Sequence, residues 1–150
     1  MGGTHPVQNR GRQVAALCWR LKPHLETPIL EILLVTSLRT RRWILPKGWP
    51  MRAMSSGEAA AMEALEEAGV GGVVSEEPIG RYHYLKEKRG RAVPCMVDVY
   101  GVEVRHTLVN WPEKGKRDIA WLPAGEAAER LGEPELRHLI LTFQRSRPGG

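Results

Sequence analysis

Three glutamates in one segment have the spacing that places carboxylates side by side on a helix. Glu63 is followed by Glu66 and Glu67, and residues three and four apart share a helical face. Carboxylate oxygens are the ligands that Mg²⁺ and Mn²⁺ prefer, so the three residues are a candidate site for a hard divalent cation. The alternative interpretation is a solvated acidic flank, which is the usual role of a run of like charges.

A short loop that contains glycine precedes this segment and supports the metal interpretation. Lys47 and Gly48 directly follow a brief apolar run. Glycine lets the backbone approach a ligand closely, and lysine supplies a compact positive charge that suits phosphate. A strand, a Lys-Gly loop and an acidic helix together form one unit that suits a phosphate bound through a metal. Taken alone, the loop would be an ordinary turn.

The helix that carries the glutamates has clear start and stop signals. Ser55 and Glu58 have the spacing of a capping box, the interior consists of good helix formers, and Gly69 provides the C-terminal stop. Apolar, largely β-branched runs predict strands on both sides of this helix. The predicted strands cover residues 14–20, 29–37, 43–45, 70–74, 79–85, 92–104 and 117–122, and two later helices cover 124–131 and 135–144.

This order of strands, helix, strands and helices predicts an α/β (α+β) fold with a mixed β-sheet sandwiched between helices. Pro94 predicts an edge or a bulge within its strand, and residues 88–91 are the predicted turn of a hairpin. There is no internal repeat and no long linker, so we expect a single domain over residues 1–150. Its ordered core is expected at about 10–144, with flexible tails at 1–9 and 145–150.

The composition is that of an ordinary globular protein and excludes wholesale disorder. The 150 residues include 22 Lys+Arg and 17 Asp+Glu, which gives a formal net charge of +5; this balance favours anionic partners. The two cysteines, Cys18 and Cys95, lie in apolar runs, which predicts buried free thiols in a reducing compartment. No apolar run reaches the length of a membrane span and no signal-peptide pattern is present. The expected location is therefore cytoplasmic.

The segment from residue 48 to 70 resembles the Nudix box, G-x5-E-x7-R-E-U-x-E-E-x-G-U, in which U is apolar. The matching positions are Gly48, Glu63, Glu66, Glu67, Gly69 and Val70. Met54 and Met62 stand where the box has its first Glu and its Arg. Because that Glu and Arg pair with each other in the family, we interpret the double change as an ion pair replaced by an apolar contact.

Residues 13–20, 35–39, 43–48 and 111–117 are similar to the diphosphoinositol polyphosphate phosphohydrolase branch of the same family, so the resemblance covers roughly residues 10–140. It implies a Nudix-like mixed sheet and metal-dependent hydrolysis of a phosphoanhydride bond. The implied substrate is a polyphosphorylated small molecule, such as a diphosphoinositol polyphosphate or a dinucleoside polyphosphate. In this scheme a divalent cation neutralises phosphate charge that would repel an attacking nucleophile.

The resemblance also assigns roles to residues. It implies that Glu63, Glu66 and Glu67 are catalytic and bind Mg²⁺ or Mn²⁺, with the Gly48 carbonyl as a possible further ligand. Either Glu63 or Glu67 is the candidate general base, and the crowding of the carboxylates predicts a raised pKa when metal is absent. Basic residues in loops and in the segment before the first strand are the candidate phosphate ligands. They are Arg10, Arg12, Arg39, Arg41, Lys47, Arg89 and Arg91.

Two other functions fit the same residues. One is a catalytically silent module that binds nucleotides or RNA ends, and the other is a pyrophosphohydrolase of RNA 5′ ends. The intact glutamates favour an enzyme, because a sensor has less need for a repulsive cluster. The chain lacks a long basic stripe with interleaved aromatic residues, which argues against nucleic acid as the main partner. We expect a small-molecule substrate, no membrane association, and a monomer or homodimer. Trp49 is the tryptophan expected nearest the site.

Overall fold

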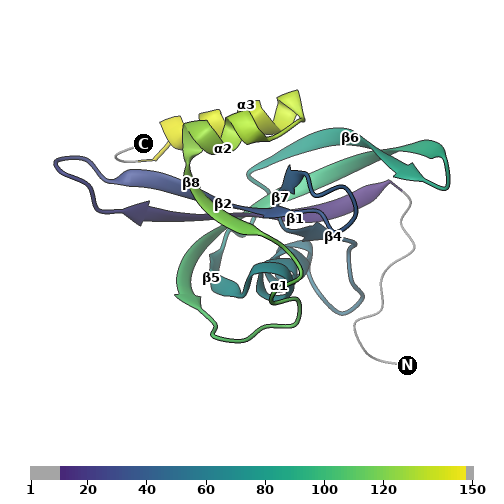
Figure 1. The fold of residues 1–150 in the computed structure, drawn as a ribbon, viewed down its shortest axis with the longest axis horizontal. Coiled ribbons are helices and arrows are strands. Elements are labelled where there is room, and N and C mark those ends of the chain that lie inside the picture. Colours follow the sequence, from purple (N-terminus) through teal and green to yellow (C-terminus); the bar gives the residue numbers. More distant parts are fainter. Residues whose placement is uncertain (1–10, 148–150) are drawn as a thin grey trace.

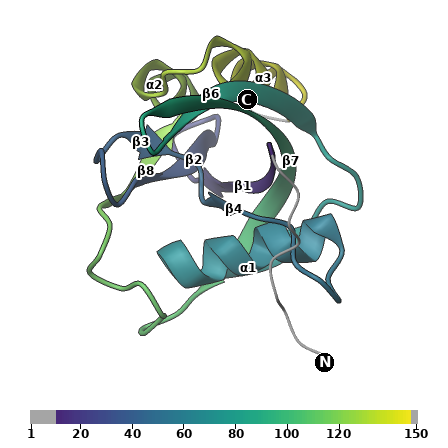
Figure 2. The same cartoon turned by 90° about the vertical axis from the view of Figure 1, so that its right-hand side faces the viewer.

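A mixed β-sheet separates one long helix from two others. The computed structural model describes residues 11–147. The predicted tail at 1–9 and residues 148–150 of the predicted tail at 145–150 lie outside that range, whereas Arg145 is the last residue of a helix. Figure 1 shows α1 below the sheet and α2 and α3 above it, and Figure 2 shows the same layers from the side. The elements are β1 (Arg12–Lys22), β2 (Ile29–Thr36), β3 (Trp43–Ile44), β4 (Lys47–Gly48), α1 (Ser56–Ala68), β5 (Val70–Val74), β6 (Gly80–Lys88), β7 (Arg91–Thr107), β8 (Ile119–Pro123), α2 (Ala124–Arg130) and α3 (Pro134–Arg145).

The sheet is built around the parallel pair β1 and β7. The strand order is β3-β2-β1-β7-β5, while β4 pairs with β1, β6 with β7 and β8 with β2. Residues 12–19 of β1 lie parallel to residues 96–103 of β7, and the other pairings are antiparallel. Residues 14–18 of β1 are buried without interruption, because helices cover both faces of this part of the sheet. The predicted fold class is confirmed.

Two hydrophobic cores lie on opposite faces of the sheet. The α3-side core contains large side chains, among them Leu17, Tyr82, Ile140 and Phe143. The α1-side core contains mainly alanines and valines from α1, β1, β2 and β7. Both cysteines are buried and free, as the sequence predicted. None of the described helices has the length and apolar character needed to cross a bilayer.

Helix α1 begins and ends as its sequence predicts. The Glu58 backbone N–H donates to Ser55 Oγ (3.1 Å), and the Ser55 backbone N–H donates to Glu58 Oε1 (2.8 Å). Gly69 then takes a left-handed conformation (φ 68°), and its N–H donates to the Leu65 carbonyl. Trp111 packs directly on Gly69, where a Cβ would lie 2.5 Å from the indole ring. Gly69 is therefore required both by its φ and by this contact.

Two local features differ from the sequence prediction. Lys47 and Gly48 form the short strand β4, paired with Ala15 and Val14 of β1, rather than a loop. Pro94 lies in the central strand β7, but within the part that pairs with β6, before the parallel register with β1 begins at Met96. The missing N–H of Pro94 is tolerated there because that end of β7 has the character of an edge.

Candidate active site

Helix α1 presents Glu63 to the backbone of β4. The two are so close that a Cβ on Gly48 would overlap the Glu63 carboxylate. The pairing of β4 with β1 fixes the position of Gly48, and the small buried residues of α1 allow the helix to approach the sheet. In this structure the group that lies close to Gly48 is a carboxylate of the chain itself, and close approach of a ligand to Gly48 stays a prediction.

Glu67 is a buried acid with one oxygen left unpaired. The residue is only 3% exposed, and its Oε1 has no hydrogen-bond partner. Burial is the largest cause that raises the pKa of Glu67 to about 9, followed by a hydrogen bond with Glu63, while Arg117 opposes the shift. Burial also raises the pKa of Glu63. The sequence predicted a raised pKa from crowding; in the structure, loss of solvent is the larger cause.

These residues fit a hard divalent cation. The unpaired buried oxygen of Glu67 and the Glu63 carboxylate against Gly48 are oxygen atoms of the kind that such a cation prefers, and they lie where an uncompensated negative charge is unfavourable. Glu66 is half-buried and lies near enough to raise the pKa of Glu63. Between residues 11 and 147 no three His, Cys, Asp or Glu side chains converge into a preformed metal cage. Ligation by all three glutamates therefore stays a prediction.

Arg117 is a component of the site that the sequence did not reveal. It comes from the segment between β7 and β8, and its Nη2 lies 3.7 Å from Glu67 Oε2. Glu113 of the same segment accepts a hydrogen bond from Arg117 Nε (2.8 Å) and adds a further carboxylate whose charge raises the pKa of both Glu63 and Glu67. No Lys or Arg on α1 itself shares the acidic face, so the compensating charge is supplied from a distant part of the chain.

Lys47 lies half-buried beside the glutamates. Its Nζ is 5.0 Å from the centroid of the Tyr84 ring. Burial is the largest cause that lowers the pKa of Lys47, and the nearby Lys86 lowers it further, whereas Glu67 and Glu133 raise it. An ammonium group in this position is partly stripped of water, and it is suited to binding an anion that enters beside α1.

A basic hollow opens next to β4. This basic hollow has a volume of about 540 Å³. Its lining residues are Gly11, Trp49, Lys86, Lys88, Arg89, Arg91, Val93 and Cys95. Trp49, the tryptophan expected nearest the site, lines this hollow and directly follows Gly48 in the chain. A larger hollow of about 730 Å³ lies between α3 and the start of β6. No residue of α1 or β4 lines either hollow, but Trp49 of the basic hollow directly follows Gly48 of β4.

The hairpin that supplies this hollow has a tight turn. Arg89 and Gly90 both have positive φ (51° and 76°) between β6 and β7, as a two-residue turn of this kind requires. The predicted hairpin is confirmed, and it places Arg89 and Arg91 on the wall of the hollow together with Lys86.

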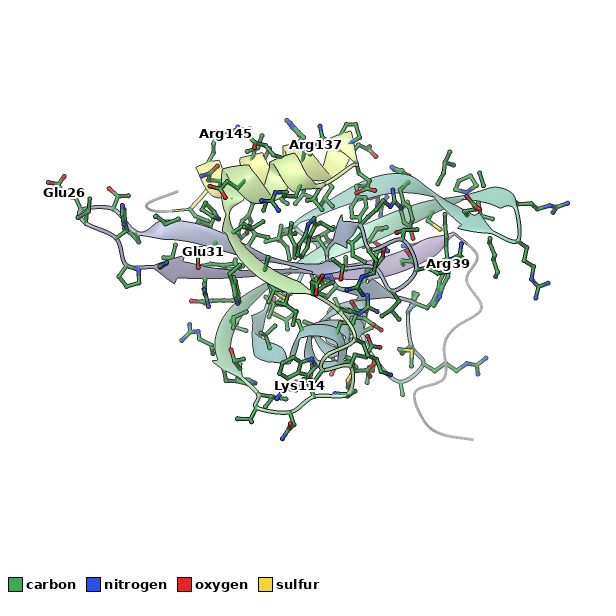
Figure 3. All side chains as sticks on the ribbon, in the orientation of Figure 1. Glu26, Glu31, Arg39, Lys114, Arg137 and Arg145 are labelled. Atoms are coloured by element: carbon green, nitrogen blue, oxygen red, sulfur yellow. The ribbon has the colours of Figure 1, made fainter. Side chains whose placement is uncertain are left out.

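The other predicted phosphate ligands have different surroundings. Arg12 is paired with Asp98 (3.1 Å). Arg41 donates to the Lys116 carbonyl (3.0 Å) and to Asp118 (3.2 Å). Arg39, labelled in Figure 3, is exposed in the β2–β3 connection. Arg10 lies outside the described residues. Arg89 and Arg91 line the basic hollow, and Lys47 lies in β4 next to Gly48, close enough to Glu67 for that charge to raise its pKa.

The chain is similar to named plant proteins. It is 31% identical over 106 residues to Nudix hydrolase 13, mitochondrial, of Arabidopsis thaliana, which covers 67% of this chain and 52% of that protein. It is 32% identical over 126 residues to Nudix hydrolase 18, mitochondrial, of the same plant, which covers 81% of this chain and 70% of that protein. The chain thus spans about half the length of the first of these relatives. No family model matches the chain.

A solved structure confirms the fold independently. The binary complex of the C. elegans Ap4A hydrolase superimposes with a TM-score of 0.60 over 90% of this chain and 96% of that one, at 16% sequence identity. The same arrangement of sheet and helices therefore occurs in that protein. Together with the box residues on β4 and α1 and the similarity to the plant proteins, this shows that the chain belongs to the Nudix hydrolase family.

Proposed function

We propose that this protein is a pyrophosphohydrolase that cleaves a phosphoanhydride bond in a polyphosphorylated small molecule and requires Mg²⁺ or Mn²⁺. The observation that carries the proposal is the buried pair of acids on α1. Glu67 is 3% exposed with an unpaired oxygen, and Glu63 is held against Gly48. Arg117 faces only one oxygen of Glu67, and a buried carboxylate oxygen without a partner is unfavourable for the fold, so a ligand-binding role explains the arrangement best.

The metal would be held by Glu63 and Glu67, with Glu66 and the Gly48 carbonyl as further candidate ligands. When bound, a divalent cation neutralises phosphate charge and activates water. Glu63 or Glu67 is the candidate to accept the proton of the attacking water, since both lie in the acidic cluster and both have raised pKa values in the absence of metal. Lys47 supplies a positive charge beside β4 for the phosphate chain.

The basic hollow supports a substrate with several negative charges. Lys86, Lys88, Arg89 and Arg91 line it, and none of its lining residues is acidic. Trp49 offers an aromatic face with Lys86 Nζ at 5.7 Å from the ring centroid. Dinucleoside polyphosphates fit both features, since they carry a phosphate chain and bases that stack; a structural neighbour is an Ap4A hydrolase. Diphosphoinositol polyphosphates fit the charge alone.

The test is a screen of the purified protein with and without Mg²⁺ or Mn²⁺. The substrates are dinucleoside polyphosphates, diphosphoinositol polyphosphates, nucleotide sugars and triphosphorylated RNA. We expect metal-dependent release of phosphorylated products from the first or second class. Glu67→Gln should lower kcat/KM by about 10²- to 10⁴-fold, the range attributed to general-base catalysis, while circular dichroism shows a retained fold.

A matched control separates this effect from a general loss of negative charge. Glu77 is exposed and lies outside the acidic face, so Glu77→Gln should leave the rate unchanged. Turnover of none of these substrates in either metal, or a Glu67→Gln variant as active as the unmodified protein, would show that the proposal is wrong.

A further inference from the structure

The segment that joins β7 to β8 is fastened along α1. The Leu108 N–H donates to the Gly69 carbonyl (2.8 Å), and the Glu113 N–H donates to the carbonyl of Glu66 (3.0 Å). Figure 3 labels Lys114 on this segment beside α1, and it labels Arg137 and Arg145 on α3 at the opposite side of the molecule. The segment therefore contacts the backbone of the same helical turn that carries the predicted catalytic residues.

Two nitrogens of the Arg117 guanidinium donate hydrogen bonds, and the third nitrogen faces Glu67. The Arg117 side chain is 10% exposed. Nε donates to Glu113 Oε1 (2.8 Å), Nη1 donates to the Thr36 carbonyl (3.1 Å), and Nη2 lies 3.7 Å from Glu67 Oε2. Because a guanidinium is a rigid planar fork, the first two bonds fix where the third nitrogen lies.

We propose that Arg117 is a positioning residue for Glu67, a conclusion that rests on the function proposed above. Arg117, held to the Thr36 carbonyl of β2, attracts one carboxylate oxygen of Glu67, Oε2, and leaves Oε1 unpaired for a metal ion. Removal of a group that orients a metal ligand without contacting the metal typically lowers metal affinity or activity by about 10- to 100-fold. Arg117 has the burial and the fixed geometry that such a role requires.

The segment does not depend on Arg117 alone for its attachment. The Asp118 N–H donates to Thr36 Oγ1 (2.9 Å), and the Thr36 N–H donates to the Asp118 carbonyl (3.1 Å). Arg41 also donates to the Lys116 carbonyl (3.0 Å). These bonds fasten the same segment to β2 and the β2–β3 connection, so the contact between Arg117 and Glu67 is additional to what is needed to hold the segment in place.

The test compares Arg117→Gln and Arg117→Lys with the control Asp118→Asn. The control removes the exposed ion pair between Asp118 and Arg41 (3.2 Å), which is on the same segment but away from Glu67. The first readout is Mn²⁺ binding to substrate-free protein by electron paramagnetic resonance. The second is the division of any kinetic loss between kcat and KM for the substrate found in the screen. Circular dichroism reports the fold.

We expect Arg117→Gln to weaken Mn²⁺ binding about tenfold or more and to lower kcat with little change in KM. Arg117→Lys should recover part of the loss, since it keeps the charge and loses the fork. Asp118→Asn should match the unmodified protein. Mn²⁺ binding at the unmodified level in Arg117→Gln would overturn the proposal, and so would an equal loss in Asp118→Asn. If Arg117→Gln does not fold, the test rests on Arg117→Lys. Mn²⁺ binding and kcat equal to those of the unmodified protein in that variant would then overturn the proposal.

The same titration distinguishes this proposal from the proposed function. If the unmodified protein takes up no Mn²⁺, or if Glu67→Gln takes it up equally well, the metal site itself is wrong. If Glu67→Gln loses binding and Arg117→Gln does not, only the positioning role is wrong.

Discussion

The helices on the two faces of the sheet are built from side chains of opposite size. Helix α1 buries mainly glycine and alanine, at Gly57, Ala59, Ala60, Ala64 and Ala68, together with Glu67. Helix α3 buries Leu136, Leu139, Ile140 and Phe143. Small residues let a helix backbone approach a sheet closely, whereas large ones contribute most of the apolar area removed from water. The α1 face is therefore organised for the acidic site and the α3 face for stability.

The first turns of α1 and α3 also differ, in their capping hydrogen bonds. Helix α1 has a complete capping box between Ser55 and Glu58. Helix α3 has Pro134 in its first turn, and the side chain of its N-cap residue Glu133 makes no capping hydrogen bond. The helix with little apolar area to bury is thus fixed at its first turn by hydrogen bonds, while α3 is held chiefly by packing.

The largest expected effect is on stability from the α3 face. Ile140 is fully buried, so Ile140→Ala should lower the free energy of unfolding by about 2–5 kcal/mol, and Ile140→Val by about 0.5–1.5 kcal/mol. Urea denaturation measures both. At a temperature where each variant is folded, kcat/KM should be unchanged. A loss of activity in the folded Ile140→Val variant would contradict the division between the faces.

A smaller effect on stability, with a larger one on activity, is expected from the α1 face. Ala64 is fully buried between α1 and the sheet, so Ala64→Leu overpacks this layer and should lower the free energy of unfolding by about 1–3 kcal/mol. Because the helix must shift to accept the larger residue, Glu63 and Glu67 are displaced and kcat/KM should fall. Thermal denaturation and initial rates on the same sample test this; full activity at reduced stability would show that close approach is unimportant.

The third effect is confined to the site. Gly48→Ala places a Cβ where the Glu63 carboxylate now lies, so the carboxylate must move. Metal affinity should fall about tenfold, at the low end of the range for disturbed ligand geometry. The melting temperature should hardly change, because only the flexible end of the Glu63 side chain has to move. Mn²⁺ titration followed by thermal melting checks both statements, and an unchanged affinity would argue against Gly48 as part of the metal site.

The smallest effect concerns the first turn of α1. The N–H and hydroxyl of Ser55 hydrogen-bond to Glu58 and hold the pKa of its carboxyl below the ordinary value of 4.5. An acid whose folded-state pKa is depressed stabilises the fold above its unfolded pKa, and this contribution is lost as pH falls through the folded value. The stability difference between the unmodified protein and Glu58→Gln should therefore shrink from about pH 6 to about pH 3. Urea denaturation at several pH values measures it.

The features that the sequence predicted are those encoded locally. The capping box at Ser55 and the stop at Gly69 each depend on residues within one turn, and both are present in the structure. The strands were predicted within a few residues of their observed bounds. Strand β4 was missed because two residues carry no periodic pattern, and only their pairing with β1 makes them a strand.

The features that the sequence did not predict depend on partners far along the chain. Arg117 meets Glu67 only because the β7–β8 segment folds back along α1. The substrate-binding role of Arg12 and Arg41 stays a prediction, but each pairs with an aspartate that no local pattern identifies, Asp98 and Asp118 respectively. A basic residue in a loop is able to bind an anion. Only the tertiary structure shows whether a carboxylate of the protein is already paired with it.

The parallel pairing of β1 with β7 has a consequence for how the protein is made. Residues 12–19 pair in parallel with residues 96–103, so β1 leaves the ribosome well before this partner has been translated. Contacts between such distant residues slow folding and leave apolar strands uncovered meanwhile. Antiparallel pairing with β2 begins within a hairpin, and it gives the emerging β1 a nearby partner until β7 arrives.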